Sequence, residues 1–168
     1  MSGSYNTNAI TGSGTTRALQ FSWSLTSQNA VAATSTISWT LKGITGSGWM
    51  YGQNFSQTVN GVNKSSATKV KVTVGYTALS GTAVIAHNKT TGAGSFSAST
   101  GAELYYYGKA NSVGSGSWNL PTIDRAAPTA KTSLVSSSTT AVTVRVTSNT
   151  TALSRIQFQK NAESWVSI

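Results

Sequence analysis

Large apolar side chains alternate with small polar ones in several stretches of this 168-residue chain. Residues 19–25 read Leu-Gln-Phe-Ser-Trp-Ser-Leu, and residues 37–41 repeat the pattern as Ile-Ser-Trp-Thr-Leu. The clearest case is residues 70–76, Val-Lys-Val-Thr-Val-Gly-Tyr, in which β-branched residues alternate with charged or small ones. A period of two places neighbouring side chains on opposite faces of a β-strand. We therefore expect strands that each bury one apolar face.

Shorter apolar runs and turn residues extend this reading along the chain. Weaker strand candidates are residues 84–85, 96–98, 104–107 and 113–120. Turn signals lie at Thr45–Gly48, Asn60-Gly61, Ser80-Gly81, Thr91–Gly94 and Gly114–Gly116. No segment of 10–12 residues keeps a helical period. The pattern predicts an all-β fold, an antiparallel β-sandwich of jelly-roll or immunoglobulin-like character, with Trp23 and Trp39 in its core.

A break in the pattern divides the chain. Residues 120–128 contain both prolines and several small residues, which is typical of a boundary between units. We expect a β-sandwich domain over residues 1–128 and a short β-rich tail over residues 129–168. The tail is too short to bury a core alone. It packs on the first domain, opens a longer repeat array, or pairs with the same tail in other subunits, which is the reading we favour.

Composition indicates how the protein is stabilised and where it is made. The chain has no cysteine, so stability must come from core burial, supplemented by oligomerisation. No signal peptide or membrane-spanning run is visible, which predicts cytoplasmic synthesis and no membrane insertion. The net charge is +9, but the basic residues are scattered singly. Lys69 and Lys71 alternate along a strand, which favours a solvated face over a nucleic-acid site.

Reactive side chains are too few and too scattered to predict an enzyme. The acids are Glu103, Asp124 and Glu163, and the one histidine is His87. A glycosidase needs two carboxylates across one bond, and a serine hydrolase needs an acid beside its histidine. We expect no catalytic residue, no cofactor and no metal. His87 and Asn88 are expected to bond backbone groups in a hairpin connection.

Aromatic residues remain as candidates for binding. Trp49 and Tyr51 follow a Gly-Ser-Gly turn, and Tyr105, Tyr106 and Tyr107 place consecutive rings on alternating faces of a strand. At least one tyrosine of this triplet should therefore point outward. Exposed rings beside polar side chains bind sugars and also occur at protein interfaces. The alternative is that these rings fill the core or contacts between subunits.

Several segments resemble a known family. They are Leu19–Asn29, Ser35–Leu41, Gly81–Asn88, Gly92–Ala98 and Ser115–Ala126. In this order they resemble an uncharacterised family of siphophage tail structural proteins from phages of streptococci and related Gram-positive hosts. The most specific parts are the His87-Asn88 hairpin and the closing Trp118-x-Leu-Pro-x-Ile-x-Arg-Ala126. The family often has Asp-Gly where this chain has Thr91-Gly92, and Pro where it has Asp124.

The resemblance covers about the first 128 residues and implies a location rather than a reaction. It implies a virion component near the phage tail tip, in a receptor-binding or baseplate-associated tail fibre. Such proteins are commonly homotrimers, contact other tail proteins and recognise saccharides of the host wall. The resemblance transfers no catalytic residues.

We therefore hold two main hypotheses and a third. The first is a phage tail structural and adhesion module that binds host cell-wall polysaccharide or teichoic-acid-like polymers without catalysis. The second is an architectural spacer or oligomerisation module of the fibre, without glycan binding. The third is a wall-degrading enzyme, which requires turnover that depends on Glu103 or Asp124.

Overall fold

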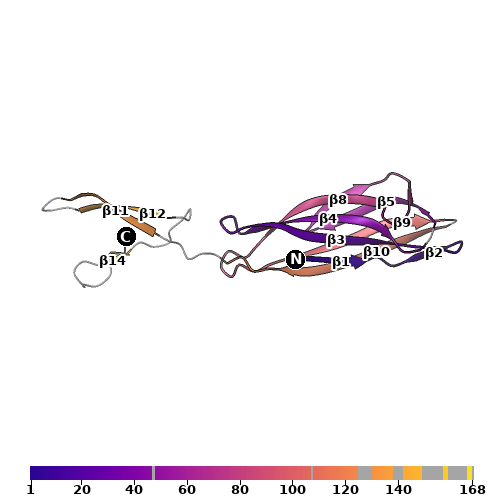
Figure 1. The fold of residues 1–168 in the computed structure, drawn as a ribbon, viewed down its shortest axis with the longest axis horizontal. Coiled ribbons are helices and arrows are strands. Elements are labelled where there is room, and N and C mark those ends of the chain that lie inside the picture. Colours follow the sequence, from indigo (N-terminus) through magenta and orange to yellow (C-terminus); the bar gives the residue numbers. More distant parts are fainter. Residues whose placement is uncertain are drawn as a thin grey trace. The chain divides into compact units, whose positions relative to one another are not determined.

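Strands account for all regular structure in the part of the chain that is described. The computed structural model describes residues 1–46, 48–106, 108–124, 130–137, 142–148, 157–158 and 166–167 (Figure 1). The strands up to residue 124 are β1 (Ser2–Asn6), β2 (Ile10–Gly12), β3 (Thr15–Asn29), β4 (Thr34–Ile44), β5 (Met50–Val59), β6 (Val62–Ser66), β7 (Val70–Val72), β8 (Thr77–Ala86), β9 (Gly94–Tyr105) and β10 (Lys109–Leu120). The all-β prediction is confirmed.

The chain divides into two units, Met1–Asp124 and Arg125–Ile168, four residues before the predicted boundary. In the described part of the second unit, β11 (Ala130–Ser137) pairs antiparallel with β12 (Val142–Ser148), and β13 (Gln157–Phe158) with β14 (Val166–Ser167). The role of this tail in oligomerisation stays a prediction.

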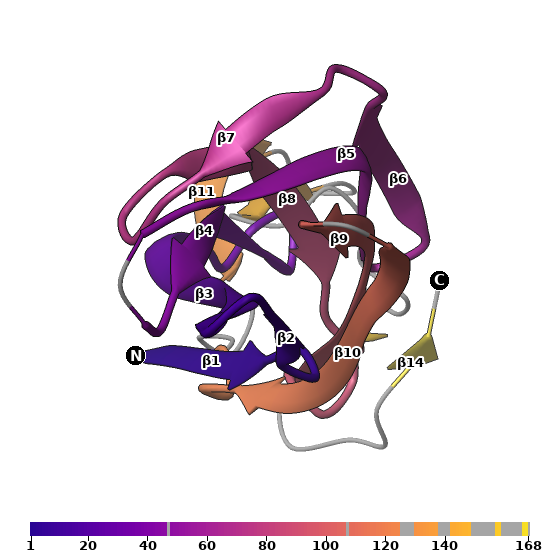
Figure 2. The ribbon, with the colours of Figure 1, turned by 90° about the vertical axis from the view of Figure 1, so that its right-hand side faces the viewer.

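Two antiparallel sheets form the first unit (Figure 2). One sheet has the order β1-β3-β4-β8, and β2 also pairs with β3. The other has the order β10-β9-β5-β6, and β7 also pairs with β5. The strands of both sheets run along the length of this unit (Figure 1). The sheets pack through their apolar faces, which confirms the predicted β-sandwich.

Alternation along each strand builds the core. Trp23 of β3 lies opposite Trp39 of β4 and both are buried, as the sequence predicts. Phe21 stacks on Tyr5 with ring centroids 5.1 Å apart and also meets Trp118 at 5.7 Å. The buried apolar cluster comprises Leu19, Phe21, Trp23, Ile37, Trp39, Leu41, Phe55, Val59, Val72, Leu79, Ile85, Phe96, Ala98, Ala102, Leu104 and Leu120.

A small polar network crosses the core between the sheets. The Tyr5 hydroxyl lies 2.6 Å from the Thr100 hydroxyl, which donates to the Gln57 side-chain oxygen. The Gln57 amide nitrogen donates back to the Tyr5 hydroxyl at 3.3 Å. Burial raises the pKa of Tyr5 above its ordinary value of 10.0 and outweighs the lowering by these hydrogen bonds. Burial therefore favours the neutral phenol of Tyr5, against the effect of these hydrogen bonds.

This raised pKa makes the fold sensitive to alkali. The stabilisation from neutral Tyr5 is complete below about pH 10, the pKa in the unfolded chain, and is lost as the pH rises through the higher folded pKa. We expect Tyr5→Phe to lose less stability than the unmodified chain between pH 9 and pH 11, measured by urea unfolding. Tyr76→Phe, outside this network, is the control. Parallel pH profiles for the Tyr5→Phe and unmodified chains would contradict the prediction.

Two sequence signals for turns were wrong. Ser80-Gly81 lies inside β8, and Gly114–Gly116 lies inside β10. A β-carbon on Gly81 would meet the Trp39 ring at 2.8 Å, and one on Gly116 would meet the Trp118 ring at 2.9 Å. Glycine at these positions makes room for an indole ring and does not form a turn.

The expectation for residues 70–76 was also wrong in its second half. The strand β7 ends at Val72, and Val74 is 59% exposed rather than inward. Gly75 has a φ of 83°, and the Tyr76 amide donates to the Thr73 carbonyl at 3.2 Å. Gly75 therefore allows a turn that interrupts the alternation.

Candidate functional site

Four of the predicted binding residues lie together at one end of the sandwich. Tyr51 of β5 pairs in register with Tyr105 of β9, and Lys71 of β7 pairs with Tyr51 on its other side. Lys109 of β10 completes the row opposite Tyr105. The side chains of their neighbours Met50 and Leu104 point inward and are buried, so the row lies on the outer face of the sheet.

Ring contacts join these tyrosines to Trp49 and Tyr106. The ring centroids are 5.0 Å apart for Trp49 and Tyr51, 5.7 Å for Trp49 and Tyr106, and 5.8 Å for Tyr51 and Tyr105. We call Trp49, Tyr51, Tyr105 and Tyr106 the aromatic platform, and each of these side chains is half-buried. Tyr107 lies outside the described residues. Sequence reasoning named the members of the platform but not their contacts.

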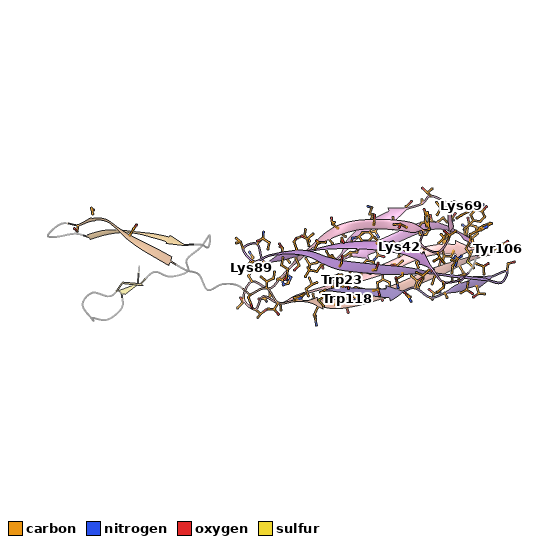
Figure 3. All side chains as sticks on the ribbon, viewed as in Figure 1. Trp23, Lys42, Lys69, Lys89, Tyr106 and Trp118 are labelled. Atoms are coloured by element: carbon orange, nitrogen blue, oxygen red, sulfur yellow. The ribbon has the colours of Figure 1, made fainter. Side chains whose placement is uncertain are left out.

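Lysine side chains lie over the rings. The Lys69 ammonium is 4.2 Å from the Tyr51 ring centre and 5.3 Å from that of Tyr105. The Lys71 ammonium is 4.6 Å from the Trp49 ring centre. We call Lys69 and Lys71 the lysine caps; Lys69 and Tyr106 mark this end of the unit in Figure 3. Both are solvent-exposed, as predicted, but their contact with the rings was missed.

One carboxylate is fixed beside the platform. Glu103 accepts a hydrogen bond from the Gln53 amide at 2.7 Å and pairs with the Lys109 ammonium at 3.2 Å. The Tyr105 hydroxyl donates to the Gln53 side-chain oxygen at 3.2 Å. Hydrogen bonds from Gln53, Lys109 and Asn54 hold the pKa of Glu103 below its ordinary value. Glu103 is therefore an ionised, partnered acceptor.

Irregular backbone shapes the strand that carries Tyr51. The pairing of β5 with β9 shifts register between Gln53 and Ser56, and Asn54 has a φ of 51°. This β-bulge turns the Asn54 side chain toward Glu103. Bulges next to binding sites commonly redirect side chains in this way.

A buried arginine holds the segments on either side of the platform. Arg17 is completely buried. Its Nε donates to the Val72 carbonyl at 3.3 Å, and its terminal nitrogens donate to the carbonyls of Thr16 and Gly48. Val72 follows Lys71 and Gly48 precedes Trp49, so one guanidinium fixes both segments. Sequence reasoning missed Arg17, although it shares the inward parity of Leu19 and Phe21.

The acidic residues of the first unit are far apart. Glu103 lies near the end of β9 that joins Tyr105, whereas Asp124 follows β10 beyond Leu120, which pairs with Gly94 at the other end of β9. Nine residue steps from Glu103 to Gly94 span about 30 Å. Two carboxylates of a glycosidase lie within about 10 Å of each other. Glu103 and Asp124 cannot act on one glycosidic bond.

Both ring nitrogens of His87 have hydrogen-bond partners within the protein, beside Gly94 at the start of β9. Its Nδ1 lies 2.7 Å from the Gly92 carbonyl, and its Nε2 lies 2.7 Å from the Ser35 hydroxyl. The carbonyl only accepts, so Nδ1 carries a proton, and in the neutral imidazole the Ser35 hydroxyl donates to Nε2. Ser35 is completely buried, which keeps its hydroxyl from a substrate. The Asn88 side-chain oxygen accepts bonds from the Thr90 and Thr91 amides, so the predicted hairpin role is confirmed.

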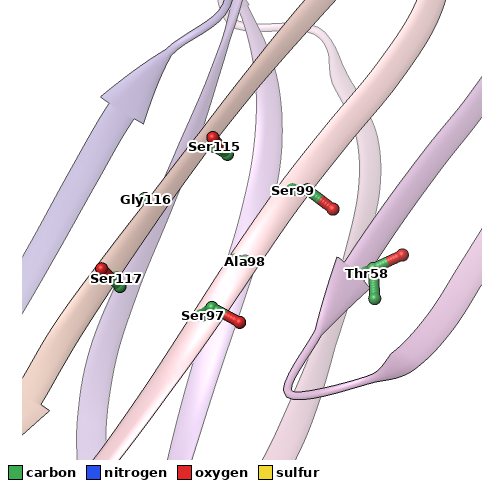
Figure 4. Close-up of a pocket in the computed structure, with 7 residues that line it drawn as sticks. All are labelled: Thr58, Ser97, Ala98, Ser99, Ser115, Gly116 and Ser117. Atoms are coloured by element: carbon green, nitrogen blue, oxygen red, sulfur yellow. The ribbon is translucent and has the colours of Figure 1, made fainter.

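The outer face of β9 and β10 carries open hollows lined by hydroxyl groups. One has a volume of about 330 Å³ and is drawn in Figure 4; its lining is Thr58, Ser97, Ala98, Ser99, Ser115, Gly116 and Ser117. Another, of about 470 Å³, includes Asn60, Trp118 and Asn119. No platform residue lines either hollow. They lie on the same sheet as the platform.

Neither a metal site nor a membrane helix is found in the described residues. Within them, no three His, Cys, Asp or Glu side chains gather as metal ligands, and no helix is long and apolar enough to span a membrane. No family model, curated protein or solved structure matches the chain. The resemblance to phage tail proteins therefore stays a prediction.

Proposed function

We propose that this chain is a non-catalytic adhesion module that binds host cell-wall polysaccharide through the aromatic platform. The observation that carries the proposal is the gathering of four half-buried rings from β5, β9 and adjoining loops on one outer face. A ring of this kind packs against the apolar face of a sugar, and polar side chains around it bond the hydroxyl groups.

The surroundings of the rings support binding without chemistry. Gln53 and Glu103 supply amide and carboxylate groups next to Tyr105, which suit sugar hydroxyl groups. The same partners keep Glu103 ionised, which is unsuitable for a proton donor in glycoside hydrolysis.

The setting that we propose is a phage tail. In this setting the chain is made in the host cytoplasm, assembles as a homo-oligomer with a trimer favoured, and contacts other tail proteins in the virion. Support comes from the resemblance of the first 128 residues and from the absence of cysteine. Light scattering on the purified chain tests the oligomeric state.

Removing two rings should weaken wall adsorption. We expect the double variant Trp49→Ala/Tyr105→Ala to bind wall polysaccharide about 10- to 100-fold more weakly, because each ring contact contributes on the order of 1 kcal/mol. The measurement is retention of purified protein on whole streptococcal cells and on wall-polysaccharide fractions.

The matched control keeps the rings. Trp49→Phe/Tyr105→Phe should retain most of the binding, and thermal melting should show that both double variants remain folded. Retention that survives the alanine changes would contradict the proposal and leave an architectural role in the fibre.

A further inference from the structure

The exposed faces of the platform rings are occupied by the chain's own cations. Lys69 lies over Tyr51 at 4.2 Å and Lys71 lies over Trp49 at 4.6 Å. Both lysines are solvent-exposed and stand at the end of long flexible stems. A sugar ring that stacks on Tyr51 or Trp49 therefore has to displace an ammonium from the same face.

In the part of the chain that the structure describes, the lysine caps form no ion pair with an acidic residue. Within the described residues, the ion pair of this region joins Lys109 to Glu103, and neither Lys69 nor Lys71 takes part in it. The buried Arg17 adds a cation whose hydrogen bonds all go to carbonyl oxygens of Thr16, Gly48 and Val72. Positive charge thus accumulates on and under the platform without an equal number of carboxylates.

An anionic group on the ligand makes it easier to displace the lysine ammonium from the ring face. Phosphate or carboxylate next to a sugar ring draws an ammonium off the aromatic face into a charge-assisted hydrogen bond. The ring face is then open for the sugar, so the two contacts form together. A neutral sugar also displaces the ammonium, but the cation–π contact is then lost without a new ion pair to replace it.

We propose that the lysine caps make the aromatic platform selective for anionic polysaccharide, in which phosphate or carboxylate groups lie next to sugar rings. The inference rests on the proposed function, since it assigns the ligand class of the same site. Trp49 and Tyr51 stack on the sugar, and Lys69 and Lys71 bind the anion beside it. The specificity comes from the exchange of an internal cation–π contact for an ion pair with the ligand.

The experiment compares polymer probes on the full chain. The probes are an anionic wall-polysaccharide fraction, the same fraction after removal of phosphate, the same fraction after reduction of its carboxyl groups, and inorganic polyphosphate. The protein variants are the unmodified chain, Lys69→Met/Lys71→Met, and the control Lys42→Met/Lys89→Met. The control removes the same charge away from the platform, at positions labelled in Figure 3.

For the unmodified chain and the control, we expect the intact fraction to bind at least about tenfold more tightly than the fraction that has lost its anion. The treatment that weakens binding identifies the anion as phosphate or carboxylate. Lys69→Met/Lys71→Met should lose this preference, and should bind the neutralised fraction as well as the unmodified chain does or better, because its rings are uncovered.

Other outcomes separate the two proposals. If both treated fractions bind as tightly as the intact one and binding still needs the rings, the selectivity is wrong and the proposed function stands. If polyphosphate binds as tightly as the intact fraction, the site is a general anion surface and the coupled contact is wrong. If no wall fraction binds the unmodified chain, the proposed function itself fails.

Discussion

Arg17→Lys is expected to lower the free energy of unfolding by about 2–4 kcal/mol, because a buried charge loses hydrogen bonds while remaining buried. The guanidinium reaches three carbonyl oxygens in different directions. An ammonium on a shorter, differently shaped head cannot reach all three. Urea unfolding followed by tryptophan fluorescence measures the loss, which corresponds to a fall in melting temperature on the order of 10 °C.

The same substitution should weaken saccharide binding although Arg17 is buried beneath the surface. Gly48 and Val72 adjoin Trp49 and Lys71, so loosening their carbonyls disturbs one ring and one lysine cap. Arg145→Lys, a change of the same kind in the second unit, is the control for both measurements. A melting curve for Arg17→Lys that matches this control would show that the guanidinium is not needed.

Phe21→Ala should have the largest effect on stability, about 3–5 kcal/mol. The ring is completely buried and lies between Tyr5 of β1, Trp39 of β4 and Trp118 of β10, with centroid distances of 5.1, 6.2 and 5.7 Å. Large rings on three sides cannot collapse into the space that the phenyl group leaves. The substitution therefore loses both burial and packing between the two sheets.

Urea unfolding at neutral pH measures this change. Val84→Ala is the control, because Val84 is 62% exposed and its truncation should change the stability by less than about 0.5 kcal/mol. A loss below about 1 kcal/mol for Phe21→Ala would mean that neighbouring rings fill the cavity. That result would contradict the packing described for the core.

The alternation of apolar and polar residues was sufficient to predict the architecture. The turn predictions failed at some glycines, because glycine occurs both in turns and in strands where a large ring lies close to the backbone. The period of two predicts that Phe21, Trp23 and Trp39 point inward, and all three are buried. Glycine marks a turn at Asn60-Gly61, but Gly81 and Gly116 lie inside strands and against indole rings. Trp39, which lies against Gly81, is distant in sequence, so no local pattern contains it, whereas Trp118 lies only two residues after Gly116 on the same face of β10.

The sequence predicted which aromatic residues form the candidate site, but not how they and the lysines contact one another. Trp49, Tyr51, Tyr105 and Tyr106 stand out as aromatic residues beside turns. That Lys71 lies beside Tyr51 depends on the pairing of β7 with β5, and pairing between strands follows from the whole fold. Arg17 carried a usable signal, because a charged residue at an inward position of an alternating strand demands buried partners.

The placement of the platform has a mechanical consequence. Lys109 begins β10 opposite Tyr105 of β9, and the chain leaves the first unit at the other end of β10, after Leu120, about 36 Å away along the strand. Tension between a tethered polymer and the rest of the chain would pull β10 along its own axis. The twelve paired positions of β9 and β10 would then resist together in shear rather than opening one after another. Such a lengthwise load path gives a sheet high resistance to rupture.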